Sequence, residues 1–296
     1  MSSIIISSPA EICLGPVGLG LKGKPTCGLL PYGLTRPKVC AVSYLNTVPL
    51  VWGIQHGPEC ELFDLSFALP SECARQLATG ETDIGIVPVA ALVDGDYEIF
   101  RGTGIACHGA VRTILLISKV PFGEIRTVAM DAGSRSSVML TRIILEQVHG
   151  IEPEWHTQPA DMMAMLADAD ACLIIGDPAL RLDPDRLRNQ GFQVADLGEE
   201  WMKLTGLPMV FAVWAGRKGT LTAERAGAFI ESYQFGRRHI DAIVESEYSA
   251  RGVAKGLVRE YLTRYIVFEL GAKEYEGMDM YLANVKRMNE QVLARK

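Results

Sequence analysis

The chain of 296 residues is long enough for two domains, and its 48% hydrophobic and 22% charged residues are typical of a folded globular protein. Its formal net charge of -6, without a run of Lys and Arg, argues against a nucleic-acid partner. The most apolar stretch, residues 84–93, is interrupted by Pro88 and is far shorter than the ~20 residues of a membrane-spanning helix. We expect neither nucleic acid nor membrane as a partner.

The cysteine and histidine content indicates neither a metal site nor an oxidising compartment. The 7 cysteines are scattered and include no C-x-x-C pair. The histidines lack metal-ligand spacing, so we expect no metal. The first 37 residues lack the ordered features of a secretory signal, and we expect a cytoplasmic protein. The sequence gives no indication of an oligomeric state.

Residues 1–37 are rich in glycine and proline. Within them, Gly18 to Gly23 match the G-x-G-x-x-G pattern of a dinucleotide site. No apolar strand precedes this pattern, and Pro25 stands where a phosphate-binding helix would begin. We interpret the segment as a disordered N-terminal extension, because such a composition rarely packs.

Beyond residue 37 the hydrophobic pattern predicts two α/β units followed by a helical segment. In the first unit, strands are predicted at 39–44, 62–67, 83–87 and, after a β-rich section from 97, at 112–118. In the second unit they are predicted at 127–130 and 171–175, separated by a helix from about 136 to 148. A further strand at 209–215 precedes predicted helices at 223–247, 250–268 and 273–294.

The predicted fold class is α/β, with two lobes that close like a clamshell on a small carboxylate-bearing molecule. The C-terminal helical segment contains no βαβ unit of its own, so we expect it to cover the first lobe and to make that lobe discontinuous. The expected division is residues 38–122 plus 213–296 for lobe I and 123–212 for lobe II. The chain would then cross between the lobes near residues 119 and 213.

The turn from Ser43 to Thr47 lies where the first predicted strand ends and a helix begins. Open α/β sheets bind ligands at this position, and Asn46 offers both donors and an acceptor. Asn46 and Thr47 are also suited to cap the helix that follows, and this alternative stays open.

A second strand-to-helix turn runs from Asp131 to Ser137. Ser134, Arg135 and Ser136 lie there at the positive end of a predicted helix, which suits a carboxylate or phosphate. The alternative is a capping box with a solvated arginine.

Two titratable residues are candidates for proton transfer. His108 lies in the glycine-bearing loop 104–113, although a lone histidine is more often a surface or structural residue. Asp177 follows a predicted strand, where it can face the cleft or cap the helix that starts at Pro178.

Five sequence blocks resemble the chorismate dehydratases, which are enzymes of the futalosine route to menaquinone. In order, they are Val42 to Leu50, Asp83 to Ala90, Asp131 with Ser134 to Ser137, Ile174 to Asp177, and the stretch from Asp196 through Trp201 and Pro208 to Trp214. Together they span residues 38 to 285 and leave out residues 1–37. The resemblance implies the fold of type 2 periplasmic solute-binding proteins.

The resemblance also implies a reaction. A chorismate dehydratase is a hydro-lyase that removes the C3 hydrogen and C4 hydroxyl of chorismate, giving 3-[(1-carboxyvinyl)oxy]benzoate in the first step of the futalosine pathway. The gain of aromaticity supplies the driving force, so no redox cofactor is expected. Asn46 would be the catalytic donor to the leaving hydroxyl. The substrate-binding residues would be Ser43, Ser71, Thr113, Ser134, Arg135, Ser136 and Asp177.

The general base stays open among His108, Asp177 and the enolpyruvyl carboxylate of the substrate, which we favour. Relatives commonly have an acidic residue where this chain has His108, so the role of His108 is in doubt.

Three other functions share the fold but fit the sequence less well. The related 1,4-dihydroxy-6-naphthoate synthases open with a Ser/Pro/Cys-rich Asn-Asp turn, unlike Ser43 to Asn46. A non-catalytic carboxylate-binding protein would usually carry a signal peptide. An effector-sensing domain of a transcription factor would need a helix-turn-helix partner.

We predict that residues 1–37 are dispensable, because of their composition and because the resemblance begins only at Lys38. A chain that starts at Lys38 should unfold at the same temperature as the full chain and retain its activity. Failure to fold, or loss of activity, would contradict this interpretation of the N-terminal segment.

Overall fold

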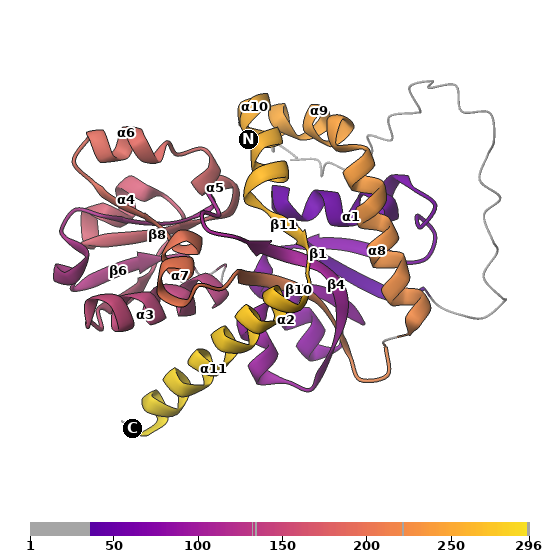
Figure 1. The fold of residues 1–296 in the computed structure, drawn as a ribbon, viewed down its shortest axis with the longest axis horizontal. Helices are drawn as coiled ribbons and strands as arrows, with labels where there is room; N and C mark the ends of the chain where they lie inside the picture. Colours follow the sequence, from indigo (N-terminus) through magenta and orange to yellow (C-terminus); the bar gives the residue numbers. More distant parts are fainter. Residues whose placement is uncertain (1–35, 132, 134, 221, 295–296) are drawn as a thin grey trace, which may run out of the picture.

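The computed structural model describes residues 36–131, 133, 135–220 and 222–294 (Figure 1). Nearly all of the expected N-terminal extension, and Ser134, therefore lie outside the described residues. The described chain forms two α/β lobes that lie side by side along the longest axis, each with its own sheet (Figure 1). No described helix combines the length and apolar character needed to cross a membrane.

Lobe I contains a six-stranded sheet with the order β11-β4-β10-β3-β1-β2. Strands β1, β2 and β3 are parallel, whereas β4, β10 and β11 pair in antiparallel fashion. The strands are β1 (Lys38–Val42), β2 (Asp64–Ala68), β3 (Ile84–Pro88), β4 (Tyr97–Cys107), β10 (Met209–Arg217) and β11 (Val267–Glu269). The helices between them are η1 (Leu45–Thr47), α1 (Val48–His56), α2 (Pro70–Thr79) and η2 (Val89–Asp94).

Lobe II contains a five-stranded sheet with the order β7-β6-β8-β5-β9. Its strands are β5 (Ile114–Ser118), β6 (Thr127–Met130), β7 (Glu154–Thr157), β8 (Ala171–Ile175) and β9 (Gln193–Asp196). Its helices are η3 (Phe122–Glu124), α3 (Arg135–His149), α4 (Met162–Asp168), α5 (Gly176–Leu180), α6 (Pro184–Asn189) and α7 (Leu197–Thr205). Strands β5 and β8 are buried at every residue, which explains their unbroken apolar runs.

Strand β5 belongs to the second sheet and not, as we expected, to the first. It pairs in antiparallel fashion with β8 and β9. The crossings between the sheets therefore lie at residues 108–113 and 197–208, so the division by sheets differs from the boundaries expected at 122 and 213. The β-rich stretch from 97 to 118 carries no signal for the point at which the chain leaves one sheet for the other.

The C-terminal segment returns to lobe I and makes it discontinuous, as predicted. Helix α8 packs along α1, with the Ser232 hydroxyl donating to Leu50 O at 2.8 Å and accepting from Ile54 N at 3.1 Å. The short strand β11 interrupts the helix expected at 250–268. The other elements are α8 (Ala223–Arg238), α9 (Ile240–Ala250), α10 (Lys255–Glu260), the π-turn η4 (Tyr261–Tyr265) and α11 (Ala272–Ala294).

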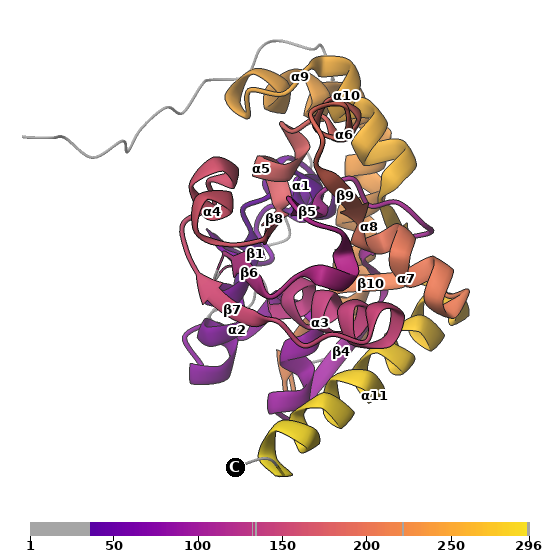
Figure 2. The same cartoon turned by 90° about the vertical axis from the view of Figure 1, so that its left-hand side faces the viewer.

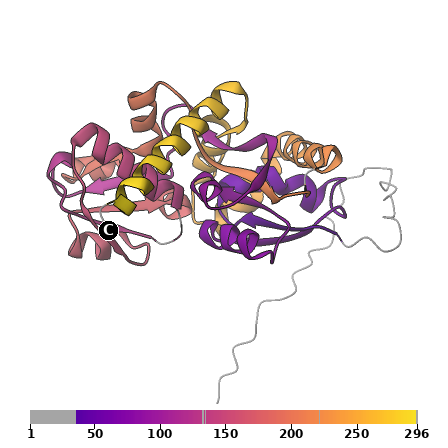
Figure 3. The same ribbon diagram turned by 90° about the horizontal axis from the view of Figure 1, so that it is seen from below.

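Helix α11 connects the lobes a second time. It runs across both lobes (Figure 3) and contacts β10 and η2 of lobe I and α3 of lobe II. The Tyr281 hydroxyl donates to Ser136 O at 2.9 Å, and Arg287 pairs with Glu146 at 2.7 Å. These contacts fix the start and the last turn of α3 against the C-terminal helix.

The buried carboxylate of Asp196 holds the two crossings together. It accepts from Val111 N at 2.9 Å and Arg112 N at 2.6 Å in the first crossing, and from Gly198 N at 3.0 Å and Glu199 N at 3.3 Å in the second. Arg112 has φ of 70°, which is unfavourable for a residue other than glycine, and its guanidinium donates to carbonyl groups of lobe II. Burial raises the pKa of Asp196, although the four N–H donors act in the opposite direction.

We predict that Asp196→Asn lowers the free energy of unfolding by about 1.5–3 kcal/mol, because the amide turns a donor toward backbone N–H groups that need an acceptor. Asp161→Asn is the matched control, since Asp161 caps α4 from an exposed position and asparagine caps equally well. Urea unfolding measures both. Equal losses in the two variants would show that Asp196 is an ordinary helix cap.

Candidate functional site

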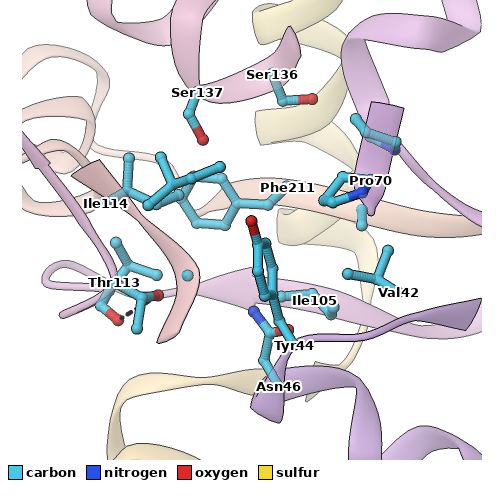
Figure 4. A pocket seen from close by; sticks show the side chains of 15 residues that line it. Val42, Tyr44, Asn46, Pro70, Ile105, Thr113, Ile114, Ser136, Ser137 and Phe211 are labelled. Atoms are coloured by element: carbon cyan, nitrogen blue, oxygen red, sulfur yellow. Dashed lines mark hydrogen bonds between the residues drawn. The ribbon is translucent and has the colours of Figure 1, made fainter. Parts of the chain in front are cut away.

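A pocket of about 530 Å³, counting the space at its mouth, lies between the lobes (Figure 4). Most of its wall is apolar, and five lining side chains carry hydroxyl or amide groups. The apolar lining residues are Val42, Pro70, Pro88, Ile105, Val111, Ile114, Ile175, Phe211 and Ala212, with the backbone of Gly176. The polar ones are Tyr44, Asn46, Thr113, Ser136 and Ser137. A wall of this kind can surround a ring and orient it with a few hydrogen bonds.

Asn46 belongs to a chain of polar groups on the lobe I side of the pocket. Its side-chain amide hydrogen-bonds the Tyr261 hydroxyl, which in turn lies 2.9 Å from Thr113 Oγ1. Thr113 Oγ1 donates to Val111 O at 3.5 Å, so the bonds run in one direction and Tyr261 accepts from the Asn46 amide nitrogen. The buried Asn46 Oδ1 has no hydrogen-bond partner among the described residues. The amide nitrogen therefore keeps one N–H group that can donate to a ligand.

The structure also decides the capping alternative. Asn46 lies within η1, and neither it nor Thr47 makes a side-chain cap bond. Thr47 occupies the N-cap position of α1 without a side-chain bond, and Asn46 does not cap either helix.

Tyr44 forms the middle of the pocket, with its hydroxyl directed toward the side where Ser136 and Ser137 lie (Figure 4). Its ring packs against Gly176 of lobe II, where a Cβ atom would lie 2.7 Å from the ring. Burial, and then the negative charges of Asp131 and Asp177, raise the pKa of Tyr44 to about 12. Tyr44 thus remains a hydrogen-bond donor near neutral pH.

Ser136 and Ser137 bring the start of α3 to the pocket, on the side opposite Asn46 (Figure 4). The buried Ser136 hydroxyl accepts from Ala90 N of lobe I at 3.0 Å and retains its own proton for donation. The first turn of a 15-residue helix supplies N–H groups without intrahelical partners. This end of the pocket is suited to an anionic group.

Arg135 is not brought to the pocket with these residues. Its half-exposed guanidinium lies 2.5 Å from Asp94 Oδ2 and lines a different hollow beside α11. Successive residues of a helix differ by about 100° in side-chain direction, and here Ser136 and Ser137 face the pocket while Arg135 points toward Asp94. The sequence pattern correctly indicated the helix terminus and Ser136, but it placed Arg135 in the pocket wrongly.

Ser43 and Ser71 lie close to the pocket without lining it through their side chains. Ser43 is exposed, and its carbonyl accepts from Arg251 Nη1 at 3.1 Å. The Ser71 N–H donates to Gly133 O of lobe II at 3.2 Å. Both residues therefore contribute backbone contacts beside the pocket.

Asp177 is engaged in an ion pair, and His108 in a hydrogen bond to a carboxyl group. Asp177 pairs with Arg251 and accepts from Leu45 N at 3.1 Å, and it makes no cap bond to its own helix. His108 Nε2 lies 2.5 Å from Glu274 Oε1. Burial alone would raise the pKa of Glu274, but hydrogen bonds from His108 and the Gly271 N–H lower it. Neither candidate base is among the residues that line the pocket.

Sequence reasoning missed Tyr44 and Tyr261 as site residues. Tyr44 lies in the turn from Ser43 to Thr47, two residues before Asn46. Its place in this turn could have indicated that it belongs to the site. Tyr261 reaches Thr113 from 148 positions along the chain, and local sequence carries no signal for such a contact.

We predict that Gly176→Ala destabilises the protein more than Gly150→Ala does. Both glycines have positive φ, of 63° and 68°, so alanine costs about 1–2 kcal/mol at either position. Only Gly176 faces the Tyr44 ring, whereas a Cβ at Gly150 meets nothing within 4 Å, so overpacking adds about 1–3 kcal/mol at Gly176. Urea unfolding of both variants measures the difference. Equal losses would contradict the close packing of Tyr44 on lobe II.

Comparisons with known proteins agree with this arrangement. Residues 37–287 match a family model described as menaquinone biosynthesis. A curated chorismate dehydratase from Thermus thermophilus is 27% identical over 250 residues, which cover 79% of this chain and 88% of that protein.

Two solved structures of low sequence identity share the fold. A protein from Archaeoglobus fulgidus superimposes with a TM-score of 0.66 at 18% identity, covering 86% of this chain and 97% of the other. The periplasmic aliphatic sulphonate binding protein from Escherichia coli superimposes with a TM-score of 0.60 at 16% identity, covering 88% and 89%. The predicted periplasmic-binding-protein-like fold is confirmed.

Proposed function

Because the chain belongs to the menaquinone biosynthesis family, we propose that it dehydrates chorismate to 3-[(1-carboxyvinyl)oxy]benzoate, the first step of the futalosine pathway. The chain would then be a hydro-lyase. The similarity to a curated chorismate dehydratase supports this choice of substrate. The apolar wall and the anion-suited terminus of α3 fit a cyclic carboxylate.

The observation that carries the proposed mechanism is that none of the described residues lining the pocket carries a charged side chain. Among these described lining residues, Tyr44 alone is titratable, and its raised pKa of about 12 makes it a donor rather than a base near neutral pH. A reaction that removes a C–H proton in such a pocket needs a base from elsewhere. The enolpyruvyl carboxylate of chorismate is attached through its ether oxygen at C3, so the substrate can supply that base itself.

The ring carboxylate is proposed to lie at the start of α3. When the proton leaves C3, negative charge spreads through the C1–C2 double bond onto this carboxylate. The Ser136 hydroxyl and the N–H groups of the first helical turn can stabilise that charge, and they need no reorganisation to do so. Arg135 is not given this role, because its guanidinium pairs with Asp94.

Asn46 is proposed to act on the C4 hydroxyl. Its free N–H hydrogen can donate to the departing oxygen, while Tyr261 and Thr113 fix the orientation of the amide. The proton taken from C3 and the hydroxide from C4 together make water, and the ring becomes aromatic. The reaction is redox-neutral. We propose a cytoplasmic site for it, with chorismate as the small-molecule partner.

Incubation of the purified protein with chorismate tests the proposal. An aromatic absorbance should develop, together with a product lighter than chorismate by one water. Binding of chorismate without conversion would instead indicate a carboxylate-binding protein. Failure both to bind and to convert it would remove chorismate and favour a later step, such as that of the related 1,4-dihydroxy-6-naphthoate synthases.

We predict that Asn46→Asp lowers kcat by on the order of a hundredfold, the effect expected when one transition-state donor is removed. An ionised aspartate cannot donate, and it adds negative charge beside a dianionic substrate. Asn189→Asp, at the exposed end of α6, is the matched control and should keep wild-type activity. Single-turnover rates and thermal unfolding of both variants make the comparison. Full activity of Asn46→Asp would remove Asn46 from the catalytic role.

A further inference from the structure

A mostly buried ion pair joins the two lobes at the rim of the pocket. Asp177 lies in the first turn of α5 of lobe II, and Arg251 follows α9 in the C-terminal segment that packs on lobe I. Their side chains are 11% and 18% exposed. Arg251 O also accepts from Arg181 Nε of lobe II at 3.0 Å, so the end of α9 is bound to lobe II through side chain and backbone. Helices α9 and α10 lie at the same end of the molecule as α5 and α6 (Figure 2).

Both partners of this pair also hold the turn that carries Tyr44 and Asn46. Asp177 Oδ1 accepts from Leu45 N at 3.1 Å, and Arg251 Nη1 donates to Ser43 O at 3.1 Å. The two contacts lie on either side of Tyr44 in the chain. The contact of Arg251 with Ser43 lies within lobe I, whereas Asp177 of lobe II reaches Leu45 only when the lobes are close together. The turn is therefore bound by a charged residue from each lobe only in the closed form.

We propose that Arg251 is a positioning residue, whose ion pair with Asp177 keeps the lobes closed and aligns the turn with Tyr44 and Asn46 for the pocket ligand. The effect on turnover rests on the proposed function, whereas the effect on closure does not. The Arg251 Nε also pairs with Glu247 Oε2 at 2.6 Å within the same segment. When the lobes separate, Arg251 keeps this partner and Asp177 meets water, so the contact can open and close reversibly.

The alternative is that Arg251 only stabilises the fold. A structural role of that kind would lower the unfolding temperature but would leave the shape and the kinetic constants of the folded protein unchanged. Two kinds of measurement therefore separate the interpretations: the shape without ligand, and the division of any kinetic loss between KM and kcat.

The shape test uses small-angle X-ray scattering of the full chain without ligand. Arg251→Gln and Asp177→Asn should each increase the radius of gyration relative to wild type. Asp177→Asn retains an acceptor for Leu45 N–H, so it tests the charge pair if Arg251→Gln folds poorly. Arg237→Gln is the control, because its ion pair with Glu269 is exposed and lies within lobe I. Folded variants as compact as wild type would overturn the proposal.

The kinetic test uses chorismate. Arg251→Gln should raise KM by on the order of tenfold, since the closed form is less populated, and should lower kcat by a smaller factor. The double variant Asp177→Asn/Arg251→Gln should lose no more than the worse single variant. Unchanged kinetic constants in Arg251→Gln, or additive losses in the double variant, would contradict the positioning role. If wild type fails to convert chorismate, the proposed function is wrong, and the scattering result alone decides the closure proposal.

Discussion

The alignment of the two crossings between the lobes depends on one buried carboxylate. Asp196 accepts four backbone N–H groups from the two crossings and thereby prevents either crossing from shifting alone. Thr113 follows the anchored residues directly, so its hydroxyl is delivered to the pocket from a rigid segment. The backbone of Arg112 is held in a left-handed conformation. Such a conformation persists only where surrounding contacts hold it, so this segment is firmly fixed. Asp196 does not line the pocket, but its carboxylate thus determines part of the geometry of the pocket.

The pocket itself relies on oriented neutral groups. An amide held by Tyr261 and Thr113 lies on one side, and the start of α3, fixed by Ala90 and Tyr281, lies on the other. In a mostly apolar wall, such dipoles act more strongly than they would in water. This arrangement suits a substrate that brings its own charge and its own base. The charged residues near the pocket act instead on the backbone and between the lobes.

Much of the fold could be predicted from the sequence, because apolar runs and helical spacing mark elements locally. The sheet to which β5 belongs could not, since β4 and β5 share the same β-rich pattern and only long-range pairing separates them. The strand-to-helix turns indicated Asn46 and Ser136 because ligands bind at such turns. Arg135 was expected in the pocket because charge was considered without helical rotation. The role of Tyr261 depends on a contact that no local pattern encodes.

The most direct test of the account is proton NMR of chorismate during a reaction with the purified protein. The C3 and C4 ring signals should disappear and four aromatic proton signals should replace them, while the two vinyl protons of the enolpyruvyl group persist. That pattern is specific to loss of water across C3 and C4. Loss of the vinyl signals with release of pyruvate, or a spectrum that stays that of chorismate, would contradict the proposed dehydration.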